Sequence, residues 1–297
     1  MKLNCCIIAI QKDEYNVEHW IDYHLNYGFT HIYLIDNNDE KNALKLPIKY
    51  KDTVTLFYAN GITNIYRTDN TGKTGVLQSQ LYNKIYEEVY KQCKDVYTHV
   101  LVIDLDEYFH SDKYNNINDL LSDNINADVL HFLWKNYSDS GYIYKSELPY
   151  DNPVDNYTQI SPDKLQMNGV RYPISNDGKS IIKFTGETLL GIHNHTFNKH
   201  QQNLELVKVN ITPDVAVINH YRTQCLEAYI DKIRLRGLYN SKWWYCNGIN
   251  LAKFYFAYNE ITAKKIEAYK KFFNDYGLRM SSSDYNFLQK QYLKLTQ

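Results

Sequence analysis

The sequence has 297 residues, of which 44% are hydrophobic and 23% are charged, a globular composition that excludes disorder as the main state. This length suffices for one large α/β domain, or for one domain with a smaller appendage. The formal net charge of -1 excludes a global positive field for nucleic acid, so an anionic ligand has to be held by a local cluster of side chains.

The first sixty residues alternate between apolar strands and one amphipathic helix. Strands are predicted at 3–10, 31–35 and 53–58, where short runs are rich in apolar residues. A helix is predicted over 15–27, because apolar residues recur there at helical spacing, and Gly28 is expected to end it. This alternation is typical of a doubly wound α/β sheet.

The same pattern continues as far as residue 134. A helix is predicted over 75–93, and the clearest strand of the sequence, 98–105, runs straight into Asp104-Leu105-Asp106-Glu107. The next predicted elements are a short helix at 117–121 and strands at 127–134 and 215–218. Between these strands, residues 135–176 are rich in Asn, Asp, Ser, Tyr and Pro and are expected to form loops and edge strands that line a cleft.

The pattern becomes helical towards the end of the sequence. Helices are predicted over 226–235 and 251–276. No repeat or low-complexity linker marks a firm domain boundary, so the expected organisation is an α/β domain of residues 1–225 with a helical segment, 226–297, packed on it.

Five cysteines, an odd number with no Cys-x-x-Cys pattern, indicate buried free thiols in a reducing compartment. They are Cys5, Cys6, Cys93, Cys225 and Cys246. No signal peptide precedes the first apolar run, and no apolar stretch approaches the length of a membrane span. The sequence therefore predicts a soluble cytoplasmic protein, and peripheral membrane attachment stays open.

Two carboxylates stand at the end of the clearest predicted strand. Residues two apart on an extended strand point to the same side, so Asp104 and Asp106 are expected to face one point at the edge where open α/β sheets bind ligands. These hard oxygen ligands suit Mg²⁺ or Mn²⁺, and Glu107 adds a third negative charge that needs a counter-ion. Asp-x-Asp also occurs by chance in loops, and phosphatases, nucleases and nucleotidyltransferases use similar pairs.

Several short patterns occur in the same order in one known group of enzymes. They are Lys12-Asp13-Glu14 with Trp20, Tyr23-His24 and Gly28; 33–37; Gln78 with Tyr82-Asn83; 103–108; 179–182; and Asn219-His220-Tyr221 with Glu227, Lys232 and Arg236-Gly237. In these patterns, over roughly residues 5–240, the sequence resembles the GT-A-fold glycosyltransferases of the family 2-like type, close to family 92. It departs from them at Gln224-Cys225, where the family often has Lys-Ser, and at 137–141, where aromatic-Gly-Ser-Ser-Gly is usual.

The resemblance implies an α/β fold of the GT-A, Rossmann-like kind, with a mixed sheet flanked by helices, and it implies roles for particular residues. The nucleotide and diphosphate would be bound by Glu14, Asp36, Asn37, Gln78, Lys179 and Arg236. The metal, Mn²⁺ or Mg²⁺, would be held by Asp104, Asp106 and His220, with His193 and His195 as rivals to His220. The candidates for the general base are Asp139 and Glu187, and those for sugar contacts are Trp134, His193 and His195.

Each of these roles has a simpler alternative. Glu14 could cap the following helix, and Asp36-Asn37 could be turn formers. Each histidine could equally be a surface residue or a hydrogen-bonded one, and Trp134 could belong to the core.

The function that the resemblance implies is transfer of a hexose from a UDP-sugar, UDP-galactose or UDP-glucose, to a glycan or glycoconjugate acceptor, with inversion at the sugar carbon. Nucleic acid is not an expected partner, because the sequence lacks a basic stripe. Two alternatives stay open. One is a metal-dependent nucleotidyl or phosphoryl transferase that uses the same aspartate pair, and the other is a non-catalytic protein that binds a nucleotide sugar.

Overall fold

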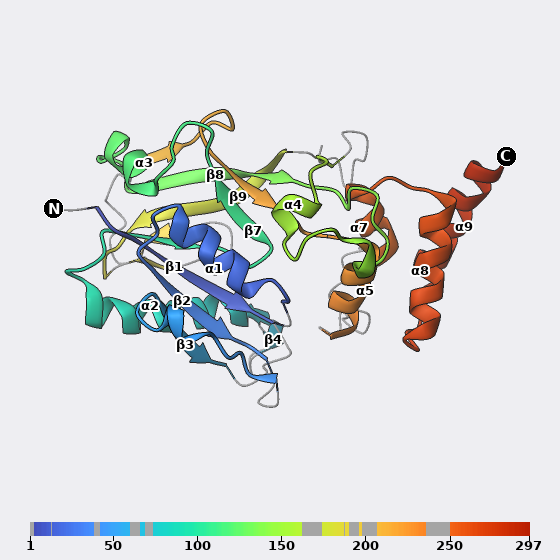
Figure 1. Ribbon diagram of the computed structural model, residues 1–297, viewed down its shortest axis with the longest axis horizontal. Coiled ribbons are helices and arrows are strands. Elements are labelled where there is room, and N and C mark those ends of the chain that lie inside the picture. Colours follow the sequence, from blue (N-terminus) through green and yellow to red (C-terminus); the bar gives the residue numbers. More distant parts are fainter. Residues whose placement is uncertain are drawn as a thin grey trace. The chain divides into compact units, whose positions relative to one another are not determined.

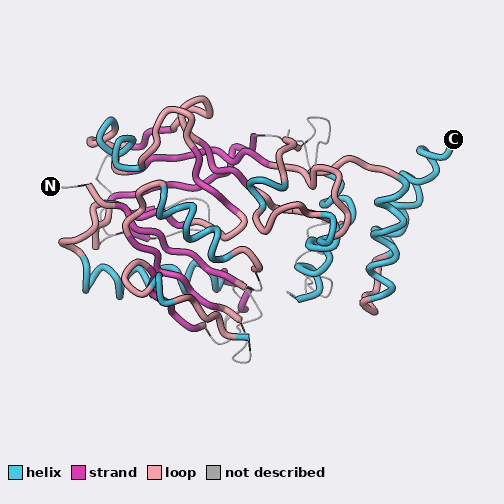
Figure 2. Tube along the Cα trace, in the orientation of Figure 1, coloured by secondary structure: helices cyan, strands magenta, loops and turns pink. Residues whose placement is uncertain are grey.

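The computed structural model describes residues 3–12, 14–38, 42–59, 66–68, 74–161, 174–186, 188–189, 196–197, 207–235 and 250–297. The chain divides into two compact units (Figures 1 and 2). Unit 1 comprises residues 1–134 and 176–219, and unit 2 comprises residues 135–175 and 220–297. The division of the chain into 1–225 and 226–297 stays a prediction.

The main sheet has nine strands within the described ranges. They are β1 (Cys5–Gln11), β2 (His31–Asp36), β3 (Val54–Tyr58), β6 (His99–Val102), β7 (Glu107–His110), β8 (Val129–Asn136), β9 (Ile174–Lys183), β12 (Lys208–Asn210) and β13 (Val217–His220). Their order is β3-β2-β1-β6-β9-β8-β13-β7, with β12 beside β8. Strands β1, β2, β3 and β6 are parallel, and β9 runs antiparallel to β6. The predicted fold class, a mixed α/β sheet flanked by helices, is confirmed.

The strands form where the sequence is apolar on both faces. Every residue of β1 is buried except the half-buried Ile10, because helices and neighbouring strands cover both faces of the sheet. Two short hairpins accompany the sheet: β4 (Tyr66–Thr68) with β5 (Thr74–Val76), and β10 (Thr188–Leu189) with β11 (Thr196–Phe197).

The helices of unit 1 are α1 (Val17–Asn26), α2 (Leu77–Cys93) and α3 (Ile117–Asp123), and Ile48–Tyr50 forms a single 3₁₀ turn. Helix α2 packs Tyr82, Ile85, Tyr86 and Val89 onto the face of β1 and β6 that carries buried apolar side chains. Helix α1 ends where the sequence predicts, since Gly28 has φ +90°, a left-handed conformation that favours glycine.

Unit 2 is mainly helical in its described part. Its helices are α4 (Pro153–Asn156), α5 (Leu226–Leu235), α7 (Leu251–Tyr258), α8 (Ala263–Asp275) and α9 (Ser282–Thr296), with a 3₁₀ turn at Lys145–Glu147. Helices α5, α7, α8 and α9 share one core. Helix α7 is buried nearly all round, and Lys253 is its one exposed residue. A helix that is apolar on every side has to lie inside such a core.

Two sequence predictions of structure are corrected. The strand predicted over 98–105 ends at Val102, and a turn then leads into β7. The helix predicted over 251–276 is two helices, because the chain leaves the helix at Asn259 and the Thr262 side chain caps a new one. Strand β9 was not predicted, and α9 lies inside the predicted helical segment 226–297 without having been predicted as a separate helix, although Ser281 is a good N-cap for it.

Four of the five cysteines lie in the described residues. Cys5, Cys6 and Cys225 are buried free thiols, as the sequence predicts, and Cys93 is a free thiol that is only half-buried. Cys246 lies outside the described residues. Burial raises the pKa of the Cys225 thiol, which makes the thiolate scarce at neutral pH.

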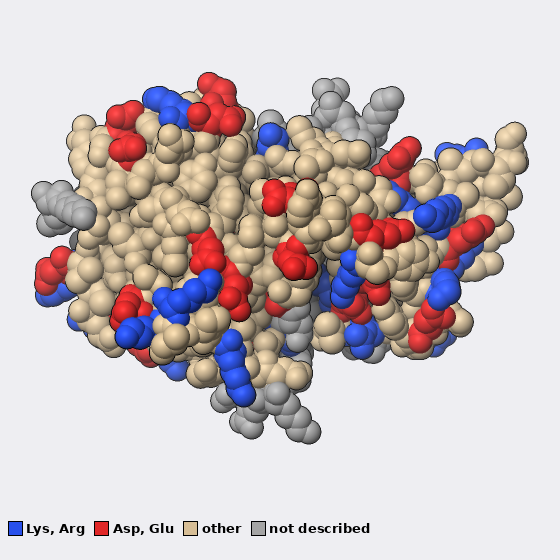
Figure 3. All heavy atoms as spheres, in the orientation of Figure 1, with Lys and Arg blue, Asp and Glu red and all other residues tan. Residues whose placement is uncertain are grey.

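The surface mixes charges of both signs. On the face shown in Figure 3, basic and acidic side chains of the described residues are interspersed. None of the described helices combines the length and the apolar composition that a bilayer crossing requires.

Candidate functional site

The carboxyl ends of the parallel strands β1, β2 and β6 form one edge of the sheet. From β1 the chain continues to β2 and then β3 on one side, and later adds β6 on the other side of β1. The strand order therefore reverses between β1 and β6. In open α/β sheets, ligands bind outside the carboxyl ends of the strands at such a reversal.

The acidic motif lies two residues beyond the end of β6. Asp104 to Glu107 form a turn, in which the backbone amide of Glu107 donates to the Asp104 carbonyl oxygen at 3.1 Å. The expectation that Asp104 and Asp106 share one side of an extended strand is therefore wrong in its basis, because the turn replaces the strand there. The turn still places three carboxylates within four residues.

The Asp104 carboxylate is held by three side chains. Its Oδ1 atom accepts hydrogen bonds from Gln78 Nε2 at 2.8 Å and from the Tyr82 hydroxyl at 3.0 Å. Its Oδ2 atom accepts one from Lys179 Nζ at 2.8 Å. Gln78 and Tyr82 are four residues apart on α2, so one face of that helix supplies both donors.

Lys179 carries the positive charge of the site. Its side chain is 0% exposed, and its ammonium lies 3.3 Å from Glu107 Oε2 as well as 2.8 Å from Asp104. Burial alone would lower the pKa of Lys179, but the charges of Asp104 and Glu107 outweigh it and raise that pKa. Lys179 therefore remains an ammonium ion inside the protein.

The backbone explains how a lysine comes to lie so deep. Lys179 follows Gly178 on β9, and a Cβ atom built on Gly178 would lie 1.8 Å from the carbonyl oxygen of Phe132 on β8. Only glycine permits this approach of the two backbones. The ammonium also lies 6.0 Å from the ring centre of Trp134, which is 4% exposed. Trp134, predicted to contact the sugar, is thus a buried side chain near Lys179.

The carboxylates differ in how readily they ionise. Burial pushes the pKa of Asp104 up, but the Lys179 ammonium holds it below the ordinary value. Burial raises the pKa of Glu107 to about 8, against the pull of Lys179 and with the help of the Asp104 and Asp106 charges. The Glu107 side chain also accepts a hydrogen bond from the Asp104 backbone amide at 2.9 Å. This bond links the first and last residues of the turn.

The carboxylate oxygens of this turn are ligands that suit a hard divalent cation. With Glu107 largely protonated near neutral pH, the two aspartates and Lys179 still leave one excess negative charge, and Asp106 is buried to 7% exposure. Among the described residues, no three His, Cys, Asp or Glu side chains are arranged as a ready metal site. The chain would thus supply Asp104 and Asp106, and a phosphate-bearing ligand and water would complete the coordination.

A second polar cluster lies at the end of β1 and β2. Gln11 pairs with Asp36 in the strand register, and its amide nitrogen contacts Asp36 Oδ1. Asp36 also accepts the backbone amides of Asn38 at 3.0 Å and Leu44 at 2.6 Å. Gln11 is 1% exposed, and within the described part of the chain its Oε1 atom has no hydrogen-bond partner.

Of the other residues predicted to contact the nucleotide, Asn37 and Glu14 lie within the described residues. Asn37 is 8% exposed beside Asp36. Glu14 is half-buried in the loop before α1, whose N-cap residue is Asn16. Arg236 lies outside the described residues, as do Glu187, His193 and His195.

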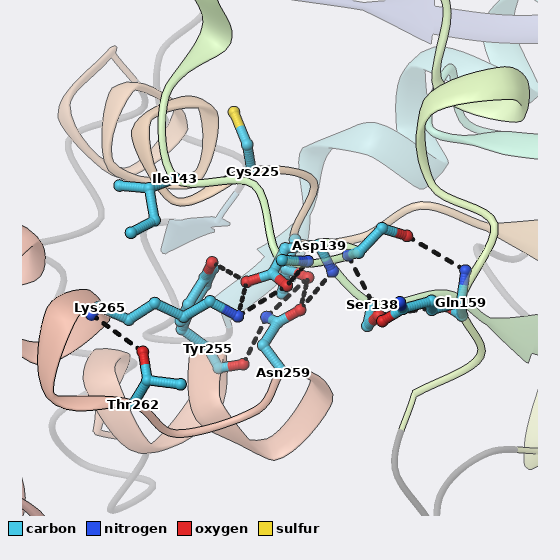
Figure 4. A network of polar contacts seen from close by, with 12 residues as sticks. Ser138, Asp139, Ile143, Gln159, Cys225, Tyr255, Asn259, Thr262 and Lys265 are labelled. Atoms are coloured by element: carbon cyan, nitrogen blue, oxygen red, sulfur yellow. Dashed lines mark hydrogen bonds and ion pairs between the residues drawn. The ribbon is translucent and has the colours of Figure 1, made fainter. Parts of the chain in front are cut away.

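Asp139 and His220 belong to unit 2. Figure 4 shows Asp139 at the centre of a buried network with Lys265, Tyr255 and Asn259. Lys265 Nζ lies 2.8 Å from both carboxylate oxygens, and the Tyr255 hydroxyl donates to Oδ2. The backbone amide of Gly141 donates to Oδ1 at 2.9 Å, and Asn259 accepts the Asp139 backbone amide. Asp139 is thus part of the packing of unit 2, and its role as a base and that of His220 as a ligand stay predictions.

Sequence reasoning missed the roles of three residues. The sequence indicates Tyr82 only as part of a motif, Glu107 only as a third negative charge beside the aspartate pair, and Gln11 not at all. Signals for two of them exist in the sequence. Tyr82 follows Gln78 by one helical turn, and Gln11 ends the first apolar run as Asp36 ends the second. Lys179 was expected at a diphosphate, and the structure places its ammonium between two carboxylates.

Comparisons with known proteins leave the chain without an assigned family. No family model matches the chain, and no curated protein matches it. Among solved structures, it is similar to the mannosyltransferase Ktr4p from S. cerevisiae, with 13% sequence identity and a TM-score of 0.24. The match covers 44% of this chain and 39% of that protein, so this chain spans well under half of its length. A likeness this distant carries no argument about function.

Proposed function

We propose that this chain is a metal-dependent glycosyltransferase that moves a hexose from a UDP-sugar, UDP-galactose or UDP-glucose, to a glycan or glycoconjugate acceptor. The observation that carries the proposal is the acidic turn Asp104–Glu107, which lies beyond β6 at the reversal of strand order. The second polar cluster, Gln11 with Asp36, ends the neighbouring strands at the same edge. A ligand with a diphosphate at one end and a nucleoside at the other suits two such clusters.

The acidic turn would serve the diphosphate. A divalent cation, Mn²⁺ or Mg²⁺, held by Asp104 and Asp106 would neutralise the charge that grows on the departing nucleoside diphosphate. Gln78, Tyr82 and Lys179 fix the Asp104 carboxylate through three contacts of 2.8–3.0 Å. The Gln78 and Tyr82 contacts hold the Asp104 carboxylate in one orientation before the donor arrives, which reduces the reorganisation that binding requires. His220 stays a proposed third ligand.

The second polar cluster would serve the nucleoside. A carboxylate only accepts hydrogen bonds, so Asp36 suits a ribose hydroxyl or a base N–H group. Gln11 Oε1 is a buried acceptor at the end of β1, and within the described residues no donor reaches it. A uracil N–H group or a ribose hydroxyl would satisfy it, and Glu14 and Asn37 are proposed to add further contacts.

The acceptor side of the reaction depends on a base. Inversion requires a group that takes the acceptor proton. To act as this base, Asp139 would have to give up its contacts with Lys265 and Tyr255, which bind both of its oxygens. Glu187 is the other candidate. A cytoplasmic location is part of the same proposal.

The proposal is tested by ligand binding and by turnover. We expect UDP with Mn²⁺ to raise the melting temperature of the chain, while GDP, ADP and nucleoside triphosphates do not. A donor screen with Mn²⁺ should release UDP. Stabilisation by triphosphates alone would favour a nucleotidyl or phosphoryl transferase, and UDP-sugar binding with no UDP release would favour a non-catalytic binding protein.

The metal assignment has its own variant. Asp106→Ala should abolish UDP release, because removal of a charged ligand costs several kcal/mol of transition-state stabilisation, and the melting temperature without metal should stay within a few degrees. Asp112→Ala is the matched control, since Asp112 is an exposed aspartate (81%) on the chain just after β7. Normal turnover by the Asp106 variant would falsify the assignment.

A further inference from the structure

Lys179 is a buried cation whose closest charged partners are carboxylates of the acidic turn. Its side chain is 0% exposed, and its ammonium lies 2.8 Å from Asp104 Oδ2 and 3.3 Å from Glu107 Oε2. Taking an ammonium ion out of water costs several kcal/mol unless close anions compensate. The two backbones at Gly178 and Phe132 approach so closely that Lys179 is built into the sheet and is not a loop residue free to move.

The position of this ammonium is where a divalent cation would also be attracted. Three carboxylates stand within four residues, and a cation held by Asp104 would have to share that carboxylate with Lys179. Gln78 and Tyr82 already bind the other oxygen of Asp104. In the metal-free chain, the Asp104 carboxylate is therefore satisfied without a metal.

We propose that Lys179 is the resident counter-cation of the acidic turn, which neutralises Asp104 in the metal-free chain and competes with the divalent cation for that carboxylate. It is a positioning residue that sets how tightly the site binds metal. This inference rests on the proposed metal assignment to Asp104 and Asp106. Its consequence is that the site is a weak metal site on its own and gains affinity when a diphosphate adds its oxygens.

A competing role and a purely structural role of Lys179 predict opposite changes in metal affinity when the lysine is removed. If Lys179 only stabilises the fold, its loss leaves metal affinity unchanged or lower, because the carboxylates lose their arrangement. If Lys179 is a competing cation, its loss raises metal affinity, because Asp104 and Asp106 then bind the metal with no ammonium beside them. The sign of the change decides between the two roles without any measurement of turnover.

The experiment uses the full chain and Mn²⁺ alone. Lys179→Met should bind Mn²⁺ about tenfold or more tightly than the wild type in a calorimetric titration, because a unit charge within a few ångströms is removed. In EDTA, this variant should melt below the wild type, since Asp104 and Glu107 lose their counter-ion. Saturating Mn²⁺ should raise its melting temperature by more than it raises that of the wild type.

Two controls are matched to this variant. Lys179→Arg keeps the charge and should bind Mn²⁺ as the wild type does. Lys183→Met removes a lysine from the same strand, where it pairs with Asp128 at the surface with side-chain exposures of 34% and 26%, and should leave Mn²⁺ affinity unchanged. Equal or weaker Mn²⁺ binding by Lys179→Met would overturn the inference.

A poorly folding variant still gives an answer. If Lys179→Met does not fold in EDTA, recovery of the folded chain in Mn²⁺, but not in KCl of equal ionic strength, supports the inference. Failure to fold in Mn²⁺ as well counts against it. These readouts are separate from glycosyl transfer, because absence of UDP release by the wild type would end the proposed function and leave the Mn²⁺ titrations interpretable.

Discussion

Asp104 shows how much of the site depends on single hydrogen bonds. The Tyr82 side chain is fully buried on α2, and its hydroxyl donates to Asp104 at 3.0 Å while it accepts from Gln78 at 2.9 Å. Hydrogen bonds to charged groups contribute more than those between neutral ones. The hydroxyl of Tyr82 thus links the helix to the acidic turn, and the aromatic ring fills the core beneath it.

Tyr82→Phe removes this hydroxyl and keeps the ring. We expect the free energy of unfolding to fall by about 1–3 kcal/mol, since a buried carboxylate loses one of its three donors. Urea denaturation measures the change. Tyr90→Phe on the same helix is the control, because the Tyr90 hydroxyl makes no hydrogen bond to the described residues, and its stability should stay within about 0.5 kcal/mol. Equal losses in both variants would contradict the link between Tyr82 and Asp104.

At the scale of elements, α1 and β7 are joined through a histidine. His24 is fully buried on α1, with Nδ1 2.8 Å from the Trp20 carbonyl oxygen and Nε2 3.4 Å from the Phe109 backbone nitrogen on β7. Nδ1 must therefore donate and Nε2 accept, which is possible only for neutral imidazole. Burial lowers the pKa of His24 to about 3, so the folded chain keeps this histidine neutral across the physiological range.

This histidine predicts a pH dependence of stability. In the unfolded chain the pKa is about 6.5, so below that pH the unfolded state takes up a proton that the folded state refuses down to about pH 3. The His24 contribution therefore falls as pH drops from about 7 towards 3, with a limiting slope of about 1.4 kcal/mol per pH unit. Denaturation of the wild type and of His24→Gln at pH 7, 6 and 5 should show that the wild type is more stable at pH 7 and that this difference in the free energy of unfolding becomes smaller as the pH is lowered.

The control is His110→Gln, which replaces a partly exposed histidine at the end of β7. Its difference from the wild type should vary less over the same range than that of His24→Gln. A His24→Gln difference that is constant from pH 7 to pH 5 would show that the pKa of His24 is the same in the folded and the unfolded chain.

At the scale of the whole molecule, the sequence predicts single strands and helices, but it does not predict contacts between residues that are far apart in the chain. The apolar runs of β1 and β2 and the helical spacing of α1 identify those elements, and they place Asp36 at the end of a strand. The turn at Asp104 could not be predicted, because the apolar residues Ile103 and Leu105 extend the pattern of strand β6 beyond its end at Val102. The contact of Lys179 with Asp104 was not predicted, because the two residues are 75 positions apart and no local pattern reports a contact across that distance.

The Asp139 network in unit 2 illustrates the same limit. Lys265 lies 126 residues from Asp139, yet their side chains are 4% and 2% exposed and form one ion pair. Asp139 begins the turn that includes Ser140 and Gly141, both with positive φ, and so the pair ties this loop to helix α8. Sequence position alone suggested a base in a cleft-forming segment, and the partner that buries the carboxylate was not visible there.

A double-mutant cycle tests what this pair does. Lys265→Met leaves a buried, uncompensated carboxylate and should cost about 3–5 kcal/mol, as should Asp139→Asn, which leaves the buried ammonium. The double variant removes both charges, so its loss should be well below the sum of the single losses. Lys271→Met, which breaks an exposed pair with Asp275 on the same helix, is the control and should cost less than about 1 kcal/mol.

The same cycle separates packing from catalysis, because the two roles change different quantities. A buried ion pair that only supports unit 2 lowers the melting temperature of Asp139→Asn, while UDP release per folded molecule at a low temperature stays within a few fold of the wild type. A general base contributes about 10²–10⁴-fold to the rate, so loss of a catalytic Asp139 would lower turnover by that factor in fully folded protein. We expect the first result, since Lys265 and Tyr255 bind both carboxylate oxygens and leave the proton of an acceptor hydroxyl no open position there.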